Sequence, residues 1–505
     1  MKIALINPPS NYSDPYPWVE PLGICYIAGA CEQVGHEVLI RDLSYSTPED
    51  LDALFRDLDE FRPDLLGMTA MTENFANGLR LARSIKSRYG CTVIFGGWHV
   101  SGNPAAVEDP VIDYAVCGEG EDTVLELLDH LQTGSPPLEE IEGIAWNSSA
   151  GVQATPKRKR IRKLERLPRP VRTGLPLDRY KYLMLNSQPI SRMRTLSIQA
   201  SRGCPYTCVF CQTPAVWSNI WSKRTPASVV DEIQELVDNH QINTFVFRDE
   251  EFTVRGSWVM EICDELVARG LNKKLTWGAF ARVDDASEEL VASMARAGCT
   301  YVLMGVEASN DTERDQTKKY YKNSEAEEAF RLYRKYGVFA QGSWIVGFPW
   351  DTIESLDAAF EWLLTLQMDS LAICFATPFH STELYDYVEK HDLFLTRDPE
   401  HFTLHEPVIR TPHIPLETLK TLPIGYRRRF YLRPRHLAHV AGTMLRHPSR
   451  IRIVAELAYD RIIAARLLST ISPDARRTAG QFEVPERYAR PLSAGPAPMP
   501  REVAV

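Results

Sequence analysis

Short apolar runs alternate with helix-like periodicity over about the first 130 residues of the chain. The runs are Ile3–Ile6, Val38–Ile40, Leu65–Met68, Val93–Phe95 and Tyr114–Val116. Continuous apolar runs separated by amphipathic segments are typical of parallel strands that helices bury on both faces. The pattern therefore predicts an α/β domain with a doubly wound sheet, and ligands of such sheets bind at the carboxyl ends of the strands.

A second βα series follows further along the chain. Its apolar runs are Leu196–Ala200, Thr244–Phe247, Leu275–Ala279, Tyr301–Gly305, Phe339–Val346 and Leu371–Ala376. Helical patterns, such as those of residues 227–240 and 288–297, separate them. Six such units predict a partial (βα)6 barrel of the TIM type, whose active site lies on the loops after the strands.

The segments outside the two βα series have other sequence patterns. Residues 144–152 resemble a hairpin, and the basic run Lys157–Arg160 indicates a solvated linker more than a nucleic-acid patch, because it is short and flanked by prolines. Beyond Phe379 the pattern becomes mostly helical, and the end is rich in Pro, Ala and Arg. We predict these units: a first domain at 1–135, hairpin and linker at 136–190, the barrel at 191–390, a helical region at 391–483 and a disordered tail at 484–505.

Composition narrows the functional class. The chain has 505 residues and a formal net charge of -9, which argues against nucleic-acid binding through overall charge. No apolar stretch approaches the roughly 18 residues that span a bilayer, and the N-terminus does not resemble a signal peptide. We therefore expect a cytoplasmic protein without a membrane span.

Three of the ten cysteines form a motif. Cys204, Cys208 and Cys211 follow an apolar strand with the spacing C-x3-C-x2-C, whereas the other seven are scattered among apolar neighbours and are expected to be core residues. Three thiolates at this spacing can ligate three irons of a 4Fe-4S cluster and leave the fourth iron open. Structural zinc, the competing interpretation, requires a fourth Cys or His, and none follows nearby.

The cysteine motif after the first barrel strand resembles that of the radical S-adenosylmethionine superfamily. The resemblance implies that the open iron chelates S-adenosylmethionine, and that an electron from the cluster cleaves it to a 5′-deoxyadenosyl radical. It also implies contacts to S-adenosylmethionine at the later strand ends, with Arg282 on the methionine carboxylate and Glu307 on the ribose. The full expected set is Phe210, Glu250, Arg282, Glu307, Gly342 and Ile345. A salt bridge between Arg282 and Glu307 is the alternative for that pair.

The first domain resembles the flavodoxin- or Rossmann-like cobalamin-binding domain found ahead of many of these enzymes, and the two resemblances together cover about the first 390 residues. They imply a cobalamin site at Pro8, Leu22, Gly23, Thr69, Thr72, Gly96, Gly97, His99, Gly118, Glu119 and Gly120. The D-x-H-x-x-G motif that supplies a lower cobalt ligand is absent, and His36 sits in a predicted turn. The resemblance thus implies base-off, His-off cobalamin, with His99 as a peripheral contact.

The resemblance favours a cobalamin-dependent methyltransferase that acts on an unreactive carbon or phosphorus of a small-molecule substrate, with an external electron donor such as flavodoxin or ferredoxin. An oxidative cyclase or ring-rearranging enzyme is the alternative, and a non-catalytic cobalamin sensor is a third option that the cysteines disfavour. The interleaved arginines and aromatics of residues 426–436 suit an anionic substrate or, equally, a helix packed on the barrel.

Overall fold

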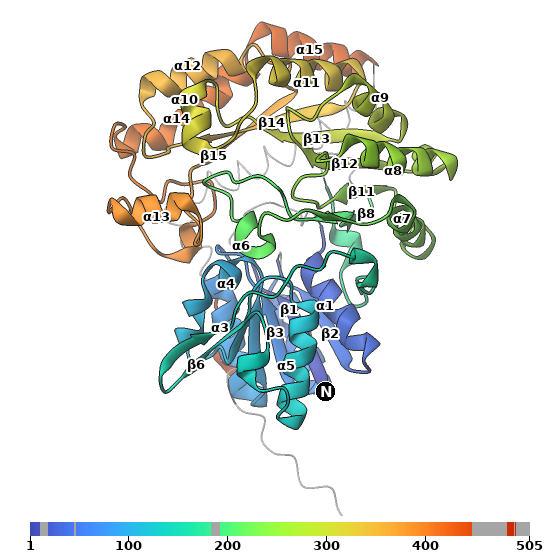
Figure 1. Ribbon diagram of the computed structural model, residues 1–505, viewed down its shortest axis with the longest axis vertical. Helices are drawn as coiled ribbons and strands as arrows, with labels where there is room; N and C mark the ends of the chain where they lie inside the picture. The colour runs from blue at the N-terminus through green and yellow to red at the C-terminus, as the bar shows by residue number, and fades with distance from the viewer. Residues whose placement is uncertain (11–18, 45–46, 183–191, 447–481, 489, 491–505) are drawn as a thin grey trace, which may run out of the picture.

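Two sheets, one mainly and one entirely of parallel strands, stand one above the other in the molecule, each covered by its own helices (Figure 1). The computed structural model describes residues 1–10, 19–44, 47–182, 192–446, 482–488 and 490. The lower sheet has the strand order β2-β1-β3-β4-β5-β6-β7, and the upper sheet has the order β15-β14-β13-β12-β11-β8. Both βα series predicted from the sequence are confirmed.

The first five strands of the lower sheet pair in parallel and alternate with helices. The parallel pairing follows from the apolar strand cores, since Ile3, Leu66 and Val93 are completely or almost completely buried. In chain order the elements are β1 (Lys2–Asn7), α1 (Leu22–Gln33), β2 (Glu37–Asp42), α2 (Pro48–Phe61), β3 (Leu65–Thr69), α3 (Phe75–Tyr89), β4 (Thr92–Gly96), α4 (Trp98–Gly102), β5 (Tyr114–Val116) and α5 (Glu121–Thr133).

The predicted hairpin consists of β6 (Ile144–Ser148) and β7 (Gly151–Ala154). Strand β6 pairs antiparallel with β5, and β7 pairs antiparallel with β6. The hairpin therefore extends the lower sheet beyond residue 135 instead of forming part of a separate linker.

The upper sheet is an open barrel whose six strands are all parallel. Two short strands, β9 (Ser201–Arg202) and β10 (Ser222–Lys223), form a separate antiparallel pair beside it. The remaining elements are β8 (Thr195–Ile198), α6 (Thr213–Trp217), α7 (Pro226–His240), β11 (Thr244–Phe247), α8 (Gly256–Ala268), β12 (Thr276–Ala281), α9 (Glu288–Arg296), β13 (Cys299–Gly305), α10 (Asp311–Thr317), α11 (Asn323–Lys335), β14 (Phe339–Val346), α12 (Ile353–Leu363), β15 (Ser370–Phe375) and α13 (Glu383–Lys390).

Strand β14 shows how the barrel wall is built. Its residues alternate strictly between half-buried and buried positions. The buried set, which includes Ala340 and Trp344, packs under the outer helices, while Phe339, Gln341 and Ser343 face the barrel interior. The interior positions keep accessible surface, so the barrel lumen is not filled by side chains at this level.

The described part of the predicted helical region contains α14 (Leu416–Tyr431) and α15 (Pro434–Arg446), which lie beside the barrel (Figure 1). Residues 447–481 of that prediction lie outside the described residues. The Tyr431 hydroxyl hydrogen-bonds Ser370 at 2.8 Å, Arg433 donates to the Leu364 carbonyl at 2.6 Å, and Arg429 pairs with Glu361. The arginine-rich segment is thus used mainly to pack a helix on the barrel. No helix in the described part of the chain has the length and apolar composition needed to cross a bilayer.

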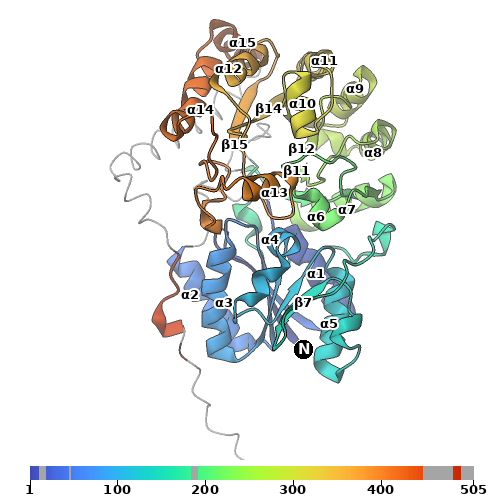
Figure 2. The same cartoon turned by 60° about the vertical axis from the view of Figure 1, so that its left-hand side comes forward.

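The described residues near the C-terminus return to the first domain, where they lie beside α2 (Figure 2). The Tyr488 ring stacks on Phe55 with centroids 4.0 Å apart, and Arg487 pairs with Asp52 at 2.8 Å. The prediction of a disordered tail from Val484 is therefore wrong for residues 484–488, because their apolar side chains pack on the lower domain's core. Residues 489 and 491–505 lie outside the described residues.

A buried ion-pair network joins the two domains below the barrel. Arg172 pairs with Glu20 at 2.8 Å and donates to the Ser197 carbonyl at 2.8 Å, while Glu20 accepts the Ser197 N–H. Glu232 completes the network at 3.5 Å from Arg172. All of these charges are nearly inaccessible to water, so each depends on its partners for compensation.

We expect Arg172→Met to lower the free energy of unfolding by about 3–5 kcal/mol, because it leaves Glu20 buried without its partner. Arg331→Met is the matched control: Arg331 is 44% exposed and pairs with Glu328 at 2.6 Å away from the network, so its loss should cost less than about 1 kcal/mol. Urea unfolding of both variants measures the difference. Equal stability of the two variants would contradict the role of the network.

Candidate active site

The loop that carries Cys204, Cys208 and Cys211, called the cluster loop below, begins with a glycine that no other residue can replace without strain. Gly203 has a φ of +87°, and a Cβ added there would lie 2.1 Å from the Ile220 carbonyl oxygen. The backbone therefore turns sharply between Arg202 and Cys204. This turn directs the cysteine-bearing segment over the carboxyl end of the barrel.

Two consecutive carboxylates after β11 hold the start of this loop. Asp249 accepts the Ala200 N–H at 3.2 Å and the Ser201 hydroxyl at 2.5 Å, and Glu250 accepts the Gly203 N–H at 2.9 Å. Burial raises the pKa of Asp249 to about 7 and raises the pKa of Glu250 above its ordinary range. Glu250, expected from the sequence to contact S-adenosylmethionine, is thus also a support of the cluster loop.

Cys204, Cys208 and Cys211 are half-buried and form no disulfide, whereas six of the other seven cysteines are buried and Cys374 is half-buried. Burial raises the pKa of the Cys204 thiol to about 12, so a metal must replace the proton to make it a thiolate. Among the described residues no three His, Cys, Asp or Glu side chains converge as ligands of a single ion would. Each thiolate of a 4Fe-4S cluster binds a different iron, so this donor set fits the cluster.

Arg282 and Glu307 do not pair with each other. The Arg282 guanidinium pairs with Asp284 at 2.8 Å and stacks on the Tyr206 ring of the cluster loop, 3.7 Å from its centroid. Glu307 forms a buried ion pair with Lys319, in space that Gly305 leaves free. The alternative of a mutual salt bridge is therefore wrong, and both side chains lie beside the cysteine loop with their charges already compensated.

Other expected contacts to S-adenosylmethionine lie on two faces of the barrel wall. Phe210 lies 6.0 Å from Phe348 between ring centroids, and Ile345 packs against the same cluster of apolar side chains. A side chain at Gly342 would instead meet Met368 on the helix-covered face. Only the backbone of Gly342 is therefore available to the lumen, and its assigned contact remains a prediction.

The predicted cobalamin residues gather at the carboxyl ends of β1, β3, β4 and β5, where a doubly wound sheet binds its ligands. They are Pro8, Leu22, Gly23, Thr69, Thr72, Gly96, Gly97, His99, Gly118, Glu119 and Gly120. A Cβ at Gly23 would meet no atom within 4 Å, and one at Gly96 would meet only the Val116 carbonyl oxygen at 3.9 Å. This open backbone surface fits a broad ring, so the residues present are compatible with cobalamin.

His99 is more enclosed than a peripheral contact requires. Its ring stacks on Phe75 with centroids 4.0 Å apart, its Nδ1 lies 3.3 Å from the Thr72 hydroxyl, and only 2% of the residue is exposed. Burial lowers the pKa of His99 to about 3, so the imidazole is neutral. His36 lies apart from this edge and contacts the amino group of Met1 at 3.2 Å.

The carboxylate of Glu119, another predicted cobalamin contact, forms ion pairs with arginines of the protein itself. It pairs with Arg160 at 2.5 Å and with Arg202 at 3.1 Å, while Glu121 takes the other side of Arg202 at 2.6 Å. Arg158 of the same basic run pairs with Glu126. The run was expected to be a solvated linker, but Arg160 ties the lower domain to the start of the cluster loop, because it pairs with the buried Glu119 and donates to the Arg202 carbonyl.

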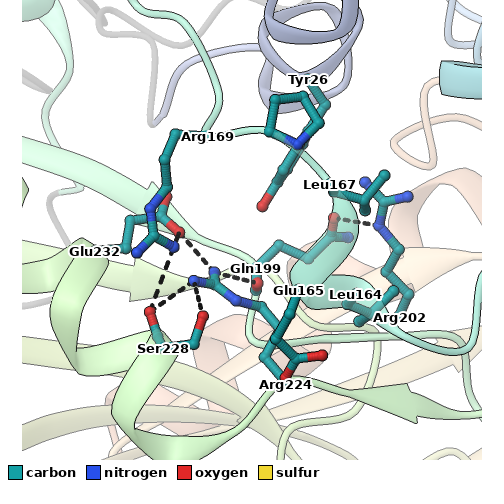
Figure 3. A pocket seen from close by; sticks show the side chains of 11 residues that line it. Tyr26, Leu164, Glu165, Leu167, Arg169, Gln199, Arg202, Arg224, Ser228 and Glu232 are labelled. Carbon is teal, nitrogen blue, oxygen red and sulfur yellow. Dashed lines mark hydrogen bonds and ion pairs between the residues drawn. The ribbon is translucent and has the colours of Figure 1, made fainter.

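A pocket of about 160 Å³ lies beside the ion pairs of Arg202 (Figure 3). Arg224 crosses it to pair with Glu232 at 2.5 Å and to donate to Ser228, while Arg202 donates to Gln199 at 2.9 Å and Tyr26 lies above. The charged side chains that line the pocket form ion pairs and hydrogen bonds with other residues of the protein. We therefore assign the pocket to the domain seam and not to a cofactor.

The two carboxyl-end edges face each other across a direct contact, with α4 below α6 and α13 (Figure 2). The Gln212 amide, next to Cys211, donates to the Trp98 carbonyl at 3.2 Å and to the His380 carbonyl at 3.3 Å. The Ser381 hydroxyl donates to the Gly102 carbonyl at 2.6 Å. The expected cluster loop and the expected cobalamin loops therefore lie side by side at this contact.

Sequence reasoning missed several residues of this arrangement. Tyr206, Gln212 and Lys319 each join separate loops, but none is a defining position of a recognisable motif. Only the position of Tyr206 and Gln212 within and beside the cysteine motif could have drawn attention to them.

Comparisons with known proteins agree with this geometry. Residues 16–128 match the B12 binding domain, and residues 198–363 match the Radical SAM superfamily. An uncharacterized methyltransferase of Pyrococcus horikoshii is 30% identical over 445 residues, covering 86% of this chain and 94% of the relative. The chain belongs to the cobalamin-dependent radical S-adenosylmethionine enzymes. Its cofactors are a 4Fe-4S cluster, S-adenosylmethionine and cobalamin.

Two further relatives of the enzyme cover most of its length. The anaerobic magnesium-protoporphyrin IX monomethyl ester cyclase of Cereibacter sphaeroides is 27% identical over 425 residues, covering 82% of this chain and 67% of the relative. The structure of the radical S-adenosylmethionine methyltransferase TsrM of Kitasatospora setae aligns with a TM-score of 0.65 and 22% identity, over 85% of each chain. The latter likeness shows the fold.

Replacing Cys204, Cys208 and Cys211 together by Ala should abolish iron–sulfur binding, because no other cysteine lies on the loop. Anaerobically reconstituted wild-type enzyme should hold about four irons and four sulfides per chain. Cys263→Ala, at a buried position on α8, is the matched control and should keep the full content. Tight zinc binding without sulfide, lost in the triple variant, would refute the cluster assignment.

Proposed function

We propose that the enzyme transfers a methyl group to an unreactive carbon, or to a phosphorus, of a small-molecule substrate. When bound, the cluster with S-adenosylmethionine would supply a 5′-deoxyadenosyl radical, and cobalamin would supply the methyl group. The observation that carries the proposal is the meeting of the two carboxyl-end edges at Gln212 and Ser381. A substrate held between them would lie within reach of both cofactors.

The chain's own residues have positioning roles in this proposal. Asp249 and Glu250 fix the backbone of the cluster loop, and the stacking of Arg282 on Tyr206 holds its far side. The ion pairs of Arg202 tie the same loop to Glu119 and Glu121 of the cobalamin-binding domain. Rigid placement of both loops would let the radical meet the substrate and not the solvent.

Radical cyclisation without methyl transfer is the second candidate, favoured by the likeness to the anaerobic cyclase. Both candidates need an electron for the cluster, and we propose an external donor of the flavodoxin or ferredoxin type in the cytoplasm. They differ in how S-adenosylmethionine is used. Only methyl transfer also requires it to methylate cobalt again after each turnover.

With methyl-labelled S-adenosylmethionine and the true substrate, we expect the label in the product. S-adenosylhomocysteine and 5′-deoxyadenosine should form in comparable amounts, because one molecule supplies the methyl group and another the radical. Mass spectrometry of the reaction measures all three species. A dehydrogenated or cyclised product, with 5′-deoxyadenosine and without S-adenosylhomocysteine, would favour the cyclase instead.

We also propose that cobalamin binds base-off and His-off, since the lower-ligand motif is absent and the His99 imidazole is enclosed by Phe75 and Thr72. Electron paramagnetic resonance of the cob(II)alamin form should show no nitrogen superhyperfine splitting from an axial base. His99→Ala and His36→Ala should leave that spectrum unchanged. A nitrogen splitting that one of these variants removes would identify that histidine as a ligand.

A further inference from the structure

The barrel lumen has an apolar floor. Val246 of β11 and Tyr301 of β13 form it together with Tyr182, which comes from the segment before the barrel. The Tyr182 and Tyr301 rings meet edge to face with centroids 5.7 Å apart, and both residues are almost completely buried. Any ligand in the lumen therefore lies above this level, toward the cluster loop.

One row of interior positions lies directly above the floor. Arg248 follows β11 directly, two positions beyond Val246, and its contact with Phe280 of β12 places it on the same interior side. Its guanidinium lies 5.7 Å from the centre of the Phe280 ring. The parallel register then places Phe280 beside Leu303 and Leu303 beside Gln341. Around the inner wall of the barrel this row therefore presents, in order, the guanidinium that follows β11, the aromatic ring of β12, the aliphatic side chain of β13 and the amide of β14.

The side-chain amide of Gln341 uses its oxygen within the protein, whereas its nitrogen can donate to a ligand. Gln341 Oε1 accepts the Tyr301 hydroxyl at 2.9 Å, and Nε2 has no hydrogen-bond acceptor among the residues that the structure describes, so it can donate to a ligand. The next row contains the small residues Ser343 and Ala372, which are paired in register and half-buried. Small side chains at this level leave room above Arg248 for a ligand.

Arg248 differs from the other cations near the mouth of the barrel. Arg282 pairs with Asp284, Lys319 with Glu307, and Arg202 with Glu119 and Glu121. Arg248 is exposed and has no carboxylate partner within the described residues, although its charge acts on the buried Tyr182 phenol below it and opposes the rise in the pKa of that group. An uncompensated guanidinium beside an aromatic ring favours an oxyanion.

We propose that the lumen binds a small organic anion, whose carboxylate or phosphate oxygens contact Arg248 and Gln341 and whose apolar part contacts Phe280 and Leu303. This anion would be the substrate, an assignment that rests on the proposed function. The site selects substrates that combine one anionic group with an apolar body.

Three small probes test the charge requirement: benzoate, phenyl phosphate and the neutral benzamide. Saturation-transfer NMR on the anaerobic, cofactor-loaded enzyme measures their binding. We expect at least one anion to bind at least tenfold more tightly than benzamide, and its binding to weaken with added salt. Inorganic phosphate as a competitor separates a general phosphate site from one that also needs the ring.

Arg248→Met should weaken the preferred anion at least tenfold and leave benzamide unchanged. Arg248→Lys should have an intermediate effect, since it keeps the charge and loses the planar fork. Arg296→Met is the matched control, because it removes the same charge from an exposed residue that pairs with Asp264 outside the barrel. It should bind all probes like the wild type.

Iron content and the cobalamin absorption spectrum establish that each variant is folded and holds its cofactors. If the Arg248→Met variant does not, the comparison is made with Arg248→Lys. Equal binding of the preferred anion by wild type and the Arg248 variants would overturn the inference, as would the absence of anion preference in the wild type. An equal loss in Arg296→Met would do the same. These outcomes are independent of whether a methyl group is transferred, so the inference and the proposed function can fail separately.

Discussion

The arrangement depends on one constraint: the carboxyl ends of two parallel sheets must face each other. Parallel sheets offer backbone groups and turn residues for ligand binding at that edge. Here the edges are held in contact by Gln212, which bonds the Trp98 and His380 carbonyls, and by Ser381, which bonds the Gly102 carbonyl. Each edge alone could bind one cofactor, whereas their apposition would bring two cofactors close to each other.

Buried charge maintains this apposition. Arg172 with Glu20, and Arg202 with Glu119 and Glu121, cross the seam between the domains at positions that water barely reaches. Buried pairs of this kind contribute little net stability but penalise any arrangement that separates them. They therefore favour one orientation of the two domains over others. Arg248, without such a partner among the described residues, contrasts with this rule and points into the lumen.

Local patterns in the sequence predicted most of the fold and singled out three cysteines as the expected cluster ligands. The apolar runs mark both sheets because buried parallel strands are apolar on both faces, and the cysteine spacing lies within one short loop. Contacts between distant segments had no such signal. The clamp of Arg160 on Glu119, the pairing of Lys319 with Glu307 and the packing of Tyr488 on Phe55 depend on tertiary structure.

The central claim is that the cluster and cobalamin face each other across one shared space. Electron paramagnetic resonance of enzyme that holds both reduced 4Fe-4S cluster and cob(II)alamin tests it most directly, because two nearby paramagnets broaden or split each other's signals. The account predicts spin–spin coupling that disappears when Cys204, Cys208 and Cys211 are replaced by Ala. Cob(II)alamin and cluster signals identical to those of the separately loaded enzyme would contradict it.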